Sequence, residues 1–302
     1  LEHGQQDDWF NDRAIVSLSV ISFFSLFFFI WRQLVYKYPI VNLSVLKDLN
    51  LRVGILMSFI LGFGLYGSTF IIPIYTQSIL GWTATDAGLL LIPSSLMTAF
   101  MMPIIGQLLQ KGVPHKYLVA IGFLMFFFFT FWMYGIMTPD TGSEFMFWPL
   151  IIRGLGLGLL FVPITTLSLS TLKGKSIGEG AAFTGMMRQL GGSFGIAIIT
   201  TFIARFTQEH RVNLLPNIDI TKTQVQDRIH QLQQGFMAKG FSTNESLSKA
   251  HQVLNMSIMK QSTVLSYMDI FLYLGILFLI CVPIILLIKS NKNKVDMSEA
   301  MH

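Results

Sequence analysis

Charged residues are scarce in this chain. They make up 12% of its 302 residues, whereas hydrophobic residues make up 52% and the mean hydropathy is +0.59. In ordinary soluble proteins about a quarter of the residues are charged. The composition therefore excludes a soluble globular domain and indicates an integral membrane protein.

Cysteine is almost absent, because Cys281 is the single one. One cysteine excludes an intramolecular disulfide, so cysteine usage does not indicate a redox compartment. The chain begins at Leu1, and no signal peptide precedes its first apolar run. We expect a truncated or processed chain.

The sequence contains seven long apolar runs. They cover residues 14–31, 53–79, 87–109, 117–137, 147–172, 181–206 and 264–288. Each is long enough to cross a bilayer, which takes about 20 helical residues, and open strand edges are not stable in lipid. The predicted fold class is therefore an all-α integral membrane protein with seven transmembrane helices.

Lysine and arginine gather on one side of these predicted helices. Alternate loops carry basic pairs such as Lys111 with Lys116 and Lys173 with Lys175, while the short loops 81–86 and 138–145 have none. By the positive-inside rule the N-terminus of this chain lies outside and its C-terminus in the cytoplasm. The net charge of +5 thus reports orientation and does not support a nucleic-acid partner.

Two segments between the runs show helical spacing. In the outer connection 207–263, apolar residues predict one amphipathic helix near 225–236, and Ser242 with Glu245 forms a capping-box pattern before a second helix that continues into the last run. The histidines of this connection match no zinc spacing and are expected on a solvated face. Residues 36–49 are predicted to lie along the inner membrane surface as a linker.

Small and polar residues divide the runs into two groups. The run 147–172 contains Arg153 followed by Gly154, Gly156 and Gly158, and the runs 53–79, 87–109 and 181–206 carry further glycine, serine, threonine, glutamine or arginine. Small residues allow close helix approach, and a charge within the membrane normally faces a partner or a wet cavity. We expect these four helices to line an interior and 117–137 and 264–288 to face lipid.

Two arginines have more than one explanation. Arg188 lies roughly 12 Å inside its run, and a structural ion pair and a substrate or gating role are equally open. Arg153 and Asp269 lie at a similar depth, so they form a candidate structural ion pair. The glycines are more often packing devices than binding groups.

Several motifs together resemble a known family. They are 73–77 with Gly81-Trp82, the loop 106–116, the Arg153-Gly154-Leu155-Gly156 element, and 180–195 with Arg188-Gln189. The chain resembles the C-terminal portion of 14-span drug:proton antiporters of the major facilitator superfamily, the EmrB/QacA-like group. In the loop 106–116, Gln110 and Val113 depart from the family's Asp and Gly.

The resemblance implies a domain organisation. Residues 1–50 correspond to an outer segment, a linker transmembrane helix and an interfacial linker, 51–288 to one six-helix half-bundle with its outer loop, and 289–302 to a cytoplasmic tail. The N-terminal half is then an absent partner. It is also where we expect the proton-carrying acid, because Asp86, Glu179 and Asp269 all lie at or near the ends of runs.

The implied function is export of small amphipathic compounds in exchange for protons by alternating access in a bacterial inner membrane. No cofactor or metal is expected beyond the proton gradient, and no enzyme activity. A periplasmic adaptor and an outer-membrane channel are possible further partners. Residues expected in substrate contact or gating are Tyr66, Tyr75, Gln77, Ser94, Arg153, Thr165, Arg188 and Gln189, and residues of the cytoplasmic gating loop are Gly106, Lys111 and Lys116.

Two other classes of protein remain open from the sequence. A seven-span receptor or sensor would have the same topology, although the last run lacks a lysine for a retinal-type Schiff base before Lys289. A membrane enzyme would need clustered acids or histidines near a membrane face, and the sequence offers none.

Overall fold

The computed structural model describes residues 13–36, 43–218 and 222–287. Regular structure in these residues is helical, as the sequence predicts. The elements are α1 (Arg13–Val35), the 3-10 turn η2 (Leu43–Lys47), α2 (Leu49–Ser78), α3 (Ala84–Leu89), α4 (Ile92–Gln110), α5 (His115–Ile136), α6 (Ser143–Leu169), α7 (Lys175–Leu214), the 3-10 turn η3 (Leu215–Ile218), α8 (Thr223–Met237) and α9 (Thr243–Leu287).

Seven helical segments among the described residues are long and apolar enough to cross a membrane. They coincide with the seven apolar runs of the sequence. The third run is divided, because α3 ends at Leu89 and α4 begins at Ile92. Pro93 lies in the first turn of α4, where a proline costs no helical hydrogen bond.

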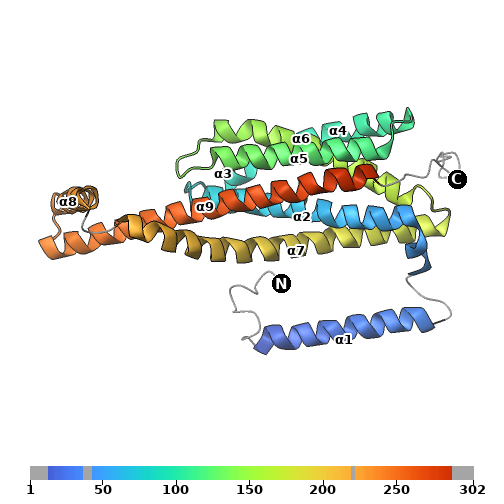
Figure 1. Cartoon of the computed structure of the whole chain (residues 1–302), viewed down its shortest axis with the longest axis horizontal. Coiled ribbons are helices and arrows are strands. Elements are labelled where there is room, and N and C mark those ends of the chain that lie inside the picture. Colours follow the sequence, from blue (N-terminus) through green and yellow to red (C-terminus); the bar gives the residue numbers. More distant parts are fainter. Residues whose placement is uncertain (1–12, 37–42, 219–221, 288–302) are drawn as a thin grey trace.

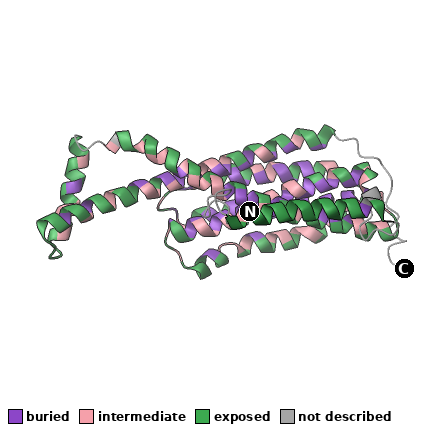
Figure 2. Cartoon of the chain, turned by 90° about the horizontal axis from the view of Figure 1, so that it is seen from below, coloured by how far each residue is buried: buried purple, intermediate pink, exposed green. Residues whose placement is uncertain are grey.

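Six of these segments form one bundle (Figure 1). Within it, α2 packs against α7 and α6, α6 packs against α4 and α5, and α9 packs against α5 and α7. Helix α1 lies apart from the bundle, and nearly all of its described side chains are exposed (Figure 2). Among the described residues, the first span therefore packs against the bundle far less than the six helices pack against one another.

Phenylalanine rings form the centre of the bundle. Phe126 of α5 contacts Phe278 of α9 at a centroid distance of 4.4 Å, and Phe129 contacts Phe271 at 5.9 Å. The expectation that these two helices simply face lipid is therefore wrong for one side of each. Their other sides are exposed, for example at Trp132. Composition alone does not distinguish a helix with one buried side from a helix surrounded by lipid.

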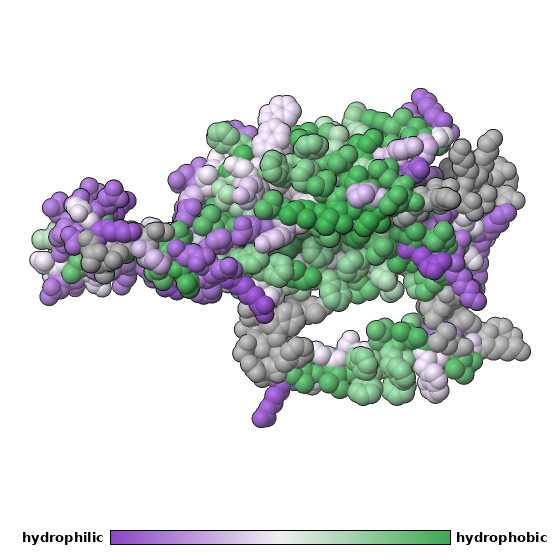
Figure 3. Space-filling model, viewed as in Figure 1, coloured by the Kyte–Doolittle hydropathy of each residue, from purple (hydrophilic) through white to green (hydrophobic). Residues whose placement is uncertain are grey.

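Helices α7 and α9 are longer than a membrane is thick. Helix α7 has 40 residues and α9 has 45, which correspond to about 60 and 68 Å at 1.5 Å per residue. Both extend beyond the apolar band, and α8 packs against the extended part of α9, where the surface is hydrophilic (Figure 3). The two helices predicted in 207–263, including continuation of the second into the last span, are confirmed.

The start of α9 forms the expected capping box. The Ser242 amide donates to Glu245 Oε2 at 3.1 Å, and the Glu245 amide donates to Ser242 Oγ at 3.4 Å. Of the predicted interfacial linker, residues 37–42 lie outside the described residues. Residues 43–47 form a 3-10 turn, and Asp48 then caps α2 by accepting a hydrogen bond from the Leu51 amide at 2.9 Å.

Candidate functional site

Arg153 connects three helices inside the bundle. The residue is 3% exposed. Its Nε donates to Ser68 Oγ of α2 at 2.9 Å, and its Nη1 donates to Ser94 Oγ of α4 at 3.0 Å. Its Nη2 donates to Thr69 Oγ1 and, at 3.4 Å, to the Leu65 carbonyl. A buried guanidinium whose three nitrogens all donate to neighbouring helices in this way holds those helices together.

Glycines beside Arg153 allow this close approach. A Cβ on Gly154 would overlap the Ser94 carbonyl oxygen, and one on Gly158 would lie 2.6 Å from Met101 Cβ. Across the same contact, Thr98 Oγ1 donates to the Gly154 carbonyl at 3.1 Å. Gly156 instead faces α5, where its Cβ would lie 3.2 Å from the Gly122 carbonyl oxygen. The motif 153–158 is therefore an interior packing element, as the sequence predicts.

Arg188 has a different environment. Its Cζ lies 4.0 Å from the centroid of the Phe161 ring of α6, so the guanidinium stacks on that ring. The side chain makes no hydrogen bond to any described residue, and its Nε is buried without a partner. Next to it, Tyr66 Oη of α2 donates to Gln189 Oε1 at 3.0 Å. We call Arg188, Phe161, Tyr66 and Gln189 the Arg188 cluster.

Glycines again bring these helices together. A Cβ on Gly62 of α2 would overlap the Arg188 carbonyl oxygen, and one on Gly192 of α7 would overlap the Tyr66 ring. A Cβ on Gly191 would overlap the Phe59 carbonyl oxygen. Helices α2 and α7 thus pack almost backbone to backbone, and this contact fixes Tyr66 beside the Arg188 segment.

The Arg188 cluster lies deep within the bundle. Arg188 is roughly 20 Å along α7 from Lys175 at the basic end of that helix, at 1.5 Å per residue. Since the hydrocarbon core of a bilayer is about 30 Å thick, this depth corresponds to the middle of the membrane. Arg188 is nevertheless half-buried and Gln189 is exposed. The cluster therefore combines depth with access from outside the half-bundle.

The expected site residues do not all gather in this cluster. Tyr75 is fully buried in the core, where its Oη donates to the Thr138 carbonyl at 2.5 Å, so it offers no surface to a ligand here. Ser94 is fully buried as a partner of Arg153. Thr165 donates to the Phe161 carbonyl of its own helix at 2.8 Å. Gln77 is exposed near the end of α2.

The expected ion pair between Arg153 and Asp269 is not formed. The hydrogen bonds of Arg153 go to α2 and α4, whereas Asp269 Oδ2 lies 2.7 Å from His210 Nε2 of α7. The physical reason is the packing order, because Asp269 lies on α9, which packs against α5 and α7. His210, expected on a solvated face, instead joins α7 to α9.

The three residues expected in a gating loop lie at one end of α4 and α5. Lys111 follows α4 directly and is exposed, and Lys116 Nζ lies 5.2 Å from the Tyr117 ring centroid at the start of α5. Gly112 between them adopts φ +87°, a conformation that favours glycine. Gly106 lies on α4, where an added Cβ would meet open space. The structure gives these residues a tight turn and no ion pair among the described residues.

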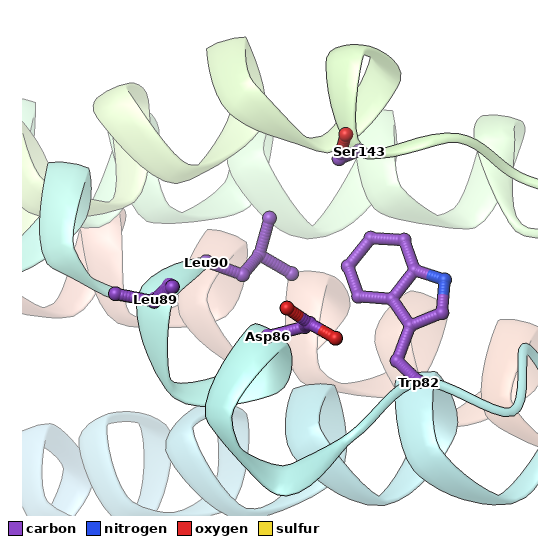
Figure 4. Close-up of a pocket in the computed structure, with 5 residues that line it drawn as sticks. All are labelled: Trp82, Asp86, Leu89, Leu90 and Ser143. Atoms are coloured by element: carbon purple, nitrogen blue, oxygen red, sulfur yellow. The ribbon is translucent and has the colours of Figure 1, made fainter.

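A shallow pocket lies at the other end of the bundle. It has a volume of about 340 Å³ and is lined by Trp82, Asp86, Leu89, Leu90 and Ser143. In Figure 4, Trp82, Asp86 and Leu90 lie around the hollow between the α3 region and the first turn of α6. Asp86 Oδ2 accepts a hydrogen bond from Thr83 at 2.7 Å. This pocket lies apart from the Arg188 cluster.

Sequence reasoning missed Phe161 and the role of His210. Phe161 precedes Thr165 by one helical turn, so it lies on the same face of α6 as Thr165, which the sequence places among the expected contact residues. That spacing is a signal that could have identified it. For metal binding, the described residues contain no group of three or more His, Cys, Asp or Glu side chains that could hold an ion.

Comparison with known proteins adds the family context. The model of the Major Facilitator Superfamily matches residues 12–196. The chain is 31% identical over 291 residues to the fatty acid resistance protein FarB of Neisseria gonorrhoeae, covering 96% of this chain and 55% of that protein. It is 27% identical over 266 residues to the multidrug export protein EmrB of Escherichia coli K12, covering 85% and 52%. The chain thus spans about half the length of the curated relatives it matches.

Proposed function

Because the chain belongs to the major facilitator superfamily, we propose that it is the C-terminal half of a bacterial efflux carrier of the EmrB/QacA-like drug:proton antiporter group. In this proposal, residues 51–288 form one wall of a central cavity and an N-terminal half forms the other. The carrier exports small amphipathic compounds in exchange for protons by alternating access. The names of the two relatives, which refer to fatty acids and to multiple drugs, support a cargo with an apolar body.

The observation that carries the proposal is the Arg188 cluster. Three transmembrane helices contribute to it, namely α2 through Tyr66, α6 through Phe161 and α7 through Arg188 and Gln189. It combines an aromatic face with a few polar groups at mid-membrane depth, which suits a loosely specified binding site. A group of this kind that faced only lipid would be costly, since a charge in the membrane normally faces a partner or a wet cavity.

The uncovered surface of α4 supports a missing second half. Helix α4 packs against α6, and its side chains Leu96 and Phe100 are each 65% exposed. In the proposal, this surface and the first span α1 contact the N-terminal half or lipid. Membership of the superfamily also favours a transporter over a seven-span receptor and over an enzyme, because the superfamily consists of transporters.

The proposed topology follows the basic loops. Lys111, Lys116, Lys173 and Lys175 lie at one end of the bundle, and the α8 extension lies at the other. By the positive-inside rule we place the first end in the cytoplasm of a bacterial inner membrane and the extension outside. An adaptor or outer-membrane channel would then meet the carrier on the side of the extension.

Dye efflux from cells that express the complete gene tests the function. We expect efflux of an amphipathic dye that stops when an uncoupler collapses the proton gradient. Cells that carry an empty vector provide the baseline. If efflux above that baseline is unaffected by the uncoupler, proton exchange is abandoned, and if no dye or fatty acid leaves faster than from the empty-vector cells, the export proposal fails.

A further inference from the structure

Arg188 is a cation without a partner at mid-membrane depth. Arg153 donates hydrogen bonds from all three of its nitrogens, whereas Arg188 donates none to any described residue. The salt bridge found among the described residues joins His210 and Asp269, so it does not involve Arg188. A deep guanidinium with free donors needs an acceptor, because an unpaired charge in the membrane is costly.

We propose that Arg188, stacked on Phe161, is the anion-binding group of the transport cavity and takes the carboxylate of an amphipathic acid. This inference rests on the proposed function, since it assigns the ligand class of that cavity. The guanidinium lies over the Phe161 ring, its Nε is buried, and its two Nη groups have no hydrogen-bond partner among the described residues. A planar fork of donors matches the two oxygens of a carboxylate.

Stacking also prepares the guanidinium for this role. The contact of 4.0 Å between Cζ and the ring centroid holds the guanidinium against the ring without using any of its hydrogen-bond donors. The ring excludes water from one face, and the lower local dielectric strengthens attraction to an anion. A residue built for helix packing, such as Arg153, uses its donors instead.

The neighbouring amide adds a second donor. In the structure Gln189 Oε1 accepts the hydrogen bond from Tyr66 Oη, and the amide NH₂ has no hydrogen-bond partner among the described residues. An NH₂ group donates and does not accept, so it also favours an anionic ligand. The two polar groups of the cluster that have no hydrogen-bond partner among the described residues, the Arg188 guanidinium and the Gln189 NH₂, are therefore both donors.

The position of the acids points the same way. The carboxylates of the described spans and their short loops lie at or near helix ends, at Asp48, Asp86, Asp140, Glu144, Glu179 and Glu209, except for Asp269, which lies inside α9 and pairs with His210 of α7. None of them hydrogen-bonds Arg188. A cationic compound next to Arg188 would meet like charge without compensation, whereas a carboxylate would neutralise the site.

Equilibrium binding to the full-length carrier in lipid nanodiscs tests the inference. The probes are three ligands with the same alkyl chain, namely dodecanoate, dodecanol and dodecylamine. We expect wild-type carrier to bind dodecanoate at least about tenfold more tightly than dodecanol, the lower end of what a charge-assisted hydrogen bond contributes. Dodecylamine should bind more weakly than both.

Substitutions then assign the preference to the side chain. Arg188→Gln should abolish the preference by lowering the affinity for dodecanoate to near that for dodecanol, and Arg188→Lys should retain part of the preference because a point charge remains without the planar fork. The matched control is Arg205→Gln, which removes an exposed arginine from the same helix. Phe161→Leu provides a second test in a variant that keeps the charge of Arg188. It should reduce the preference for dodecanoate over dodecanol by a smaller factor than Arg188→Gln does.

Several results would overturn the inference. A carboxylate preference that survives in Arg188→Gln would place the anion elsewhere. An equal loss of dodecanol and dodecanoate binding would mean that Arg188 only supports the fold, or pairs with an acid of the N-terminal half. The proposed function fails separately, since binding is measured without a gradient. Preferential binding of dodecanoate without gradient-driven efflux would support the anion site and contradict the proposed antiport. Gradient-driven efflux of a neutral dye, without a preference for dodecanoate, would support the antiport and contradict the anion site.

Discussion

Arg153 and Arg188 differ in whether their guanidinium donors are used by neighbouring helices, and this difference distinguishes a structural arginine from one that is available to a ligand. Both arginines lie on transmembrane helices beside glycines that bring a neighbouring helix close. Arg153 is 3% exposed and gives its donors to α2 and α4, whereas Arg188 is half-buried and contacts only an aromatic ring through its charge. The same residue type therefore stabilises the bundle in one region and remains available for a ligand in the other.

The largest expected effect on stability comes from removal of the Arg153 side chain. We expect Arg153→Leu to lower the free energy of unfolding by about 3 kcal/mol, because several charge-assisted hydrogen bonds between helices are lost together. The measurement is reversible unfolding of the full-length carrier in mixed micelles.

The matched control is Arg188→Leu in the same assay. It should change stability by less than about 1 kcal/mol, since Arg188 makes no hydrogen bond to the described bundle. Equal losses of stability for the two variants would contradict the division between a structural and an available arginine.

A smaller effect is expected from the glycines beside each arginine. Gly154→Ala places a Cβ against the Ser94 carbonyl oxygen and should cost about 1 to 3 kcal/mol of stability through overpacking. Gly185→Ala, one turn before Arg188, places its Cβ in open space and should be neutral within about 0.5 kcal/mol. Unfolding midpoints of the two variants in the same lipid give the comparison. A neutral Gly154→Ala would mean that α4 and α6 separate without cost.

The smallest effect concerns Asp269. A double-mutant cycle should give a coupling energy of about 1 kcal/mol between His210 and Asp269, which are 2.7 Å apart with side chains 23% and 32% exposed. The cycle for Arg153 and Asp269 should give less than about 0.5 kcal/mol, because the two share no contact or network. Measurable coupling in the second cycle, with none in the first, would restore the pair that the sequence suggested.

The sequence predicts the helices well because their cause is local. Hydrophobic length determines a span, and the Ser242 and Glu245 pattern marks the start of α9. The short interruption between α3 and α4 was not predicted, although Pro93 lies next to it. A proline at the start of a helix and one inside a helix look the same in an apolar run.

The site was predicted only in part, because sequence gives depth along a helix and not the order in which helices pack. Arg188 and Gln189 were selected and lie together with Tyr66 in the structure. Tyr75, expected in substrate contact or gating, is buried against Tyr267 of α9 at a centroid distance of 5.6 Å. Asp269 was paired with Arg153 because their depths agree, yet α9 does not bring it to α6.

The continuity of α9 has a mechanical consequence. Phe278 is fixed in the aromatic core, and Thr243 lies roughly 52 Å further along the same uninterrupted helix at 1.5 Å per residue. A tilt of the half-bundle by about 10° around that anchor would move the far tip by roughly 9 Å, because the displacement grows with the length of a rigid rod. The α8 region would thus act as a lever that amplifies a small rotation inside the membrane into a large movement beyond its surface.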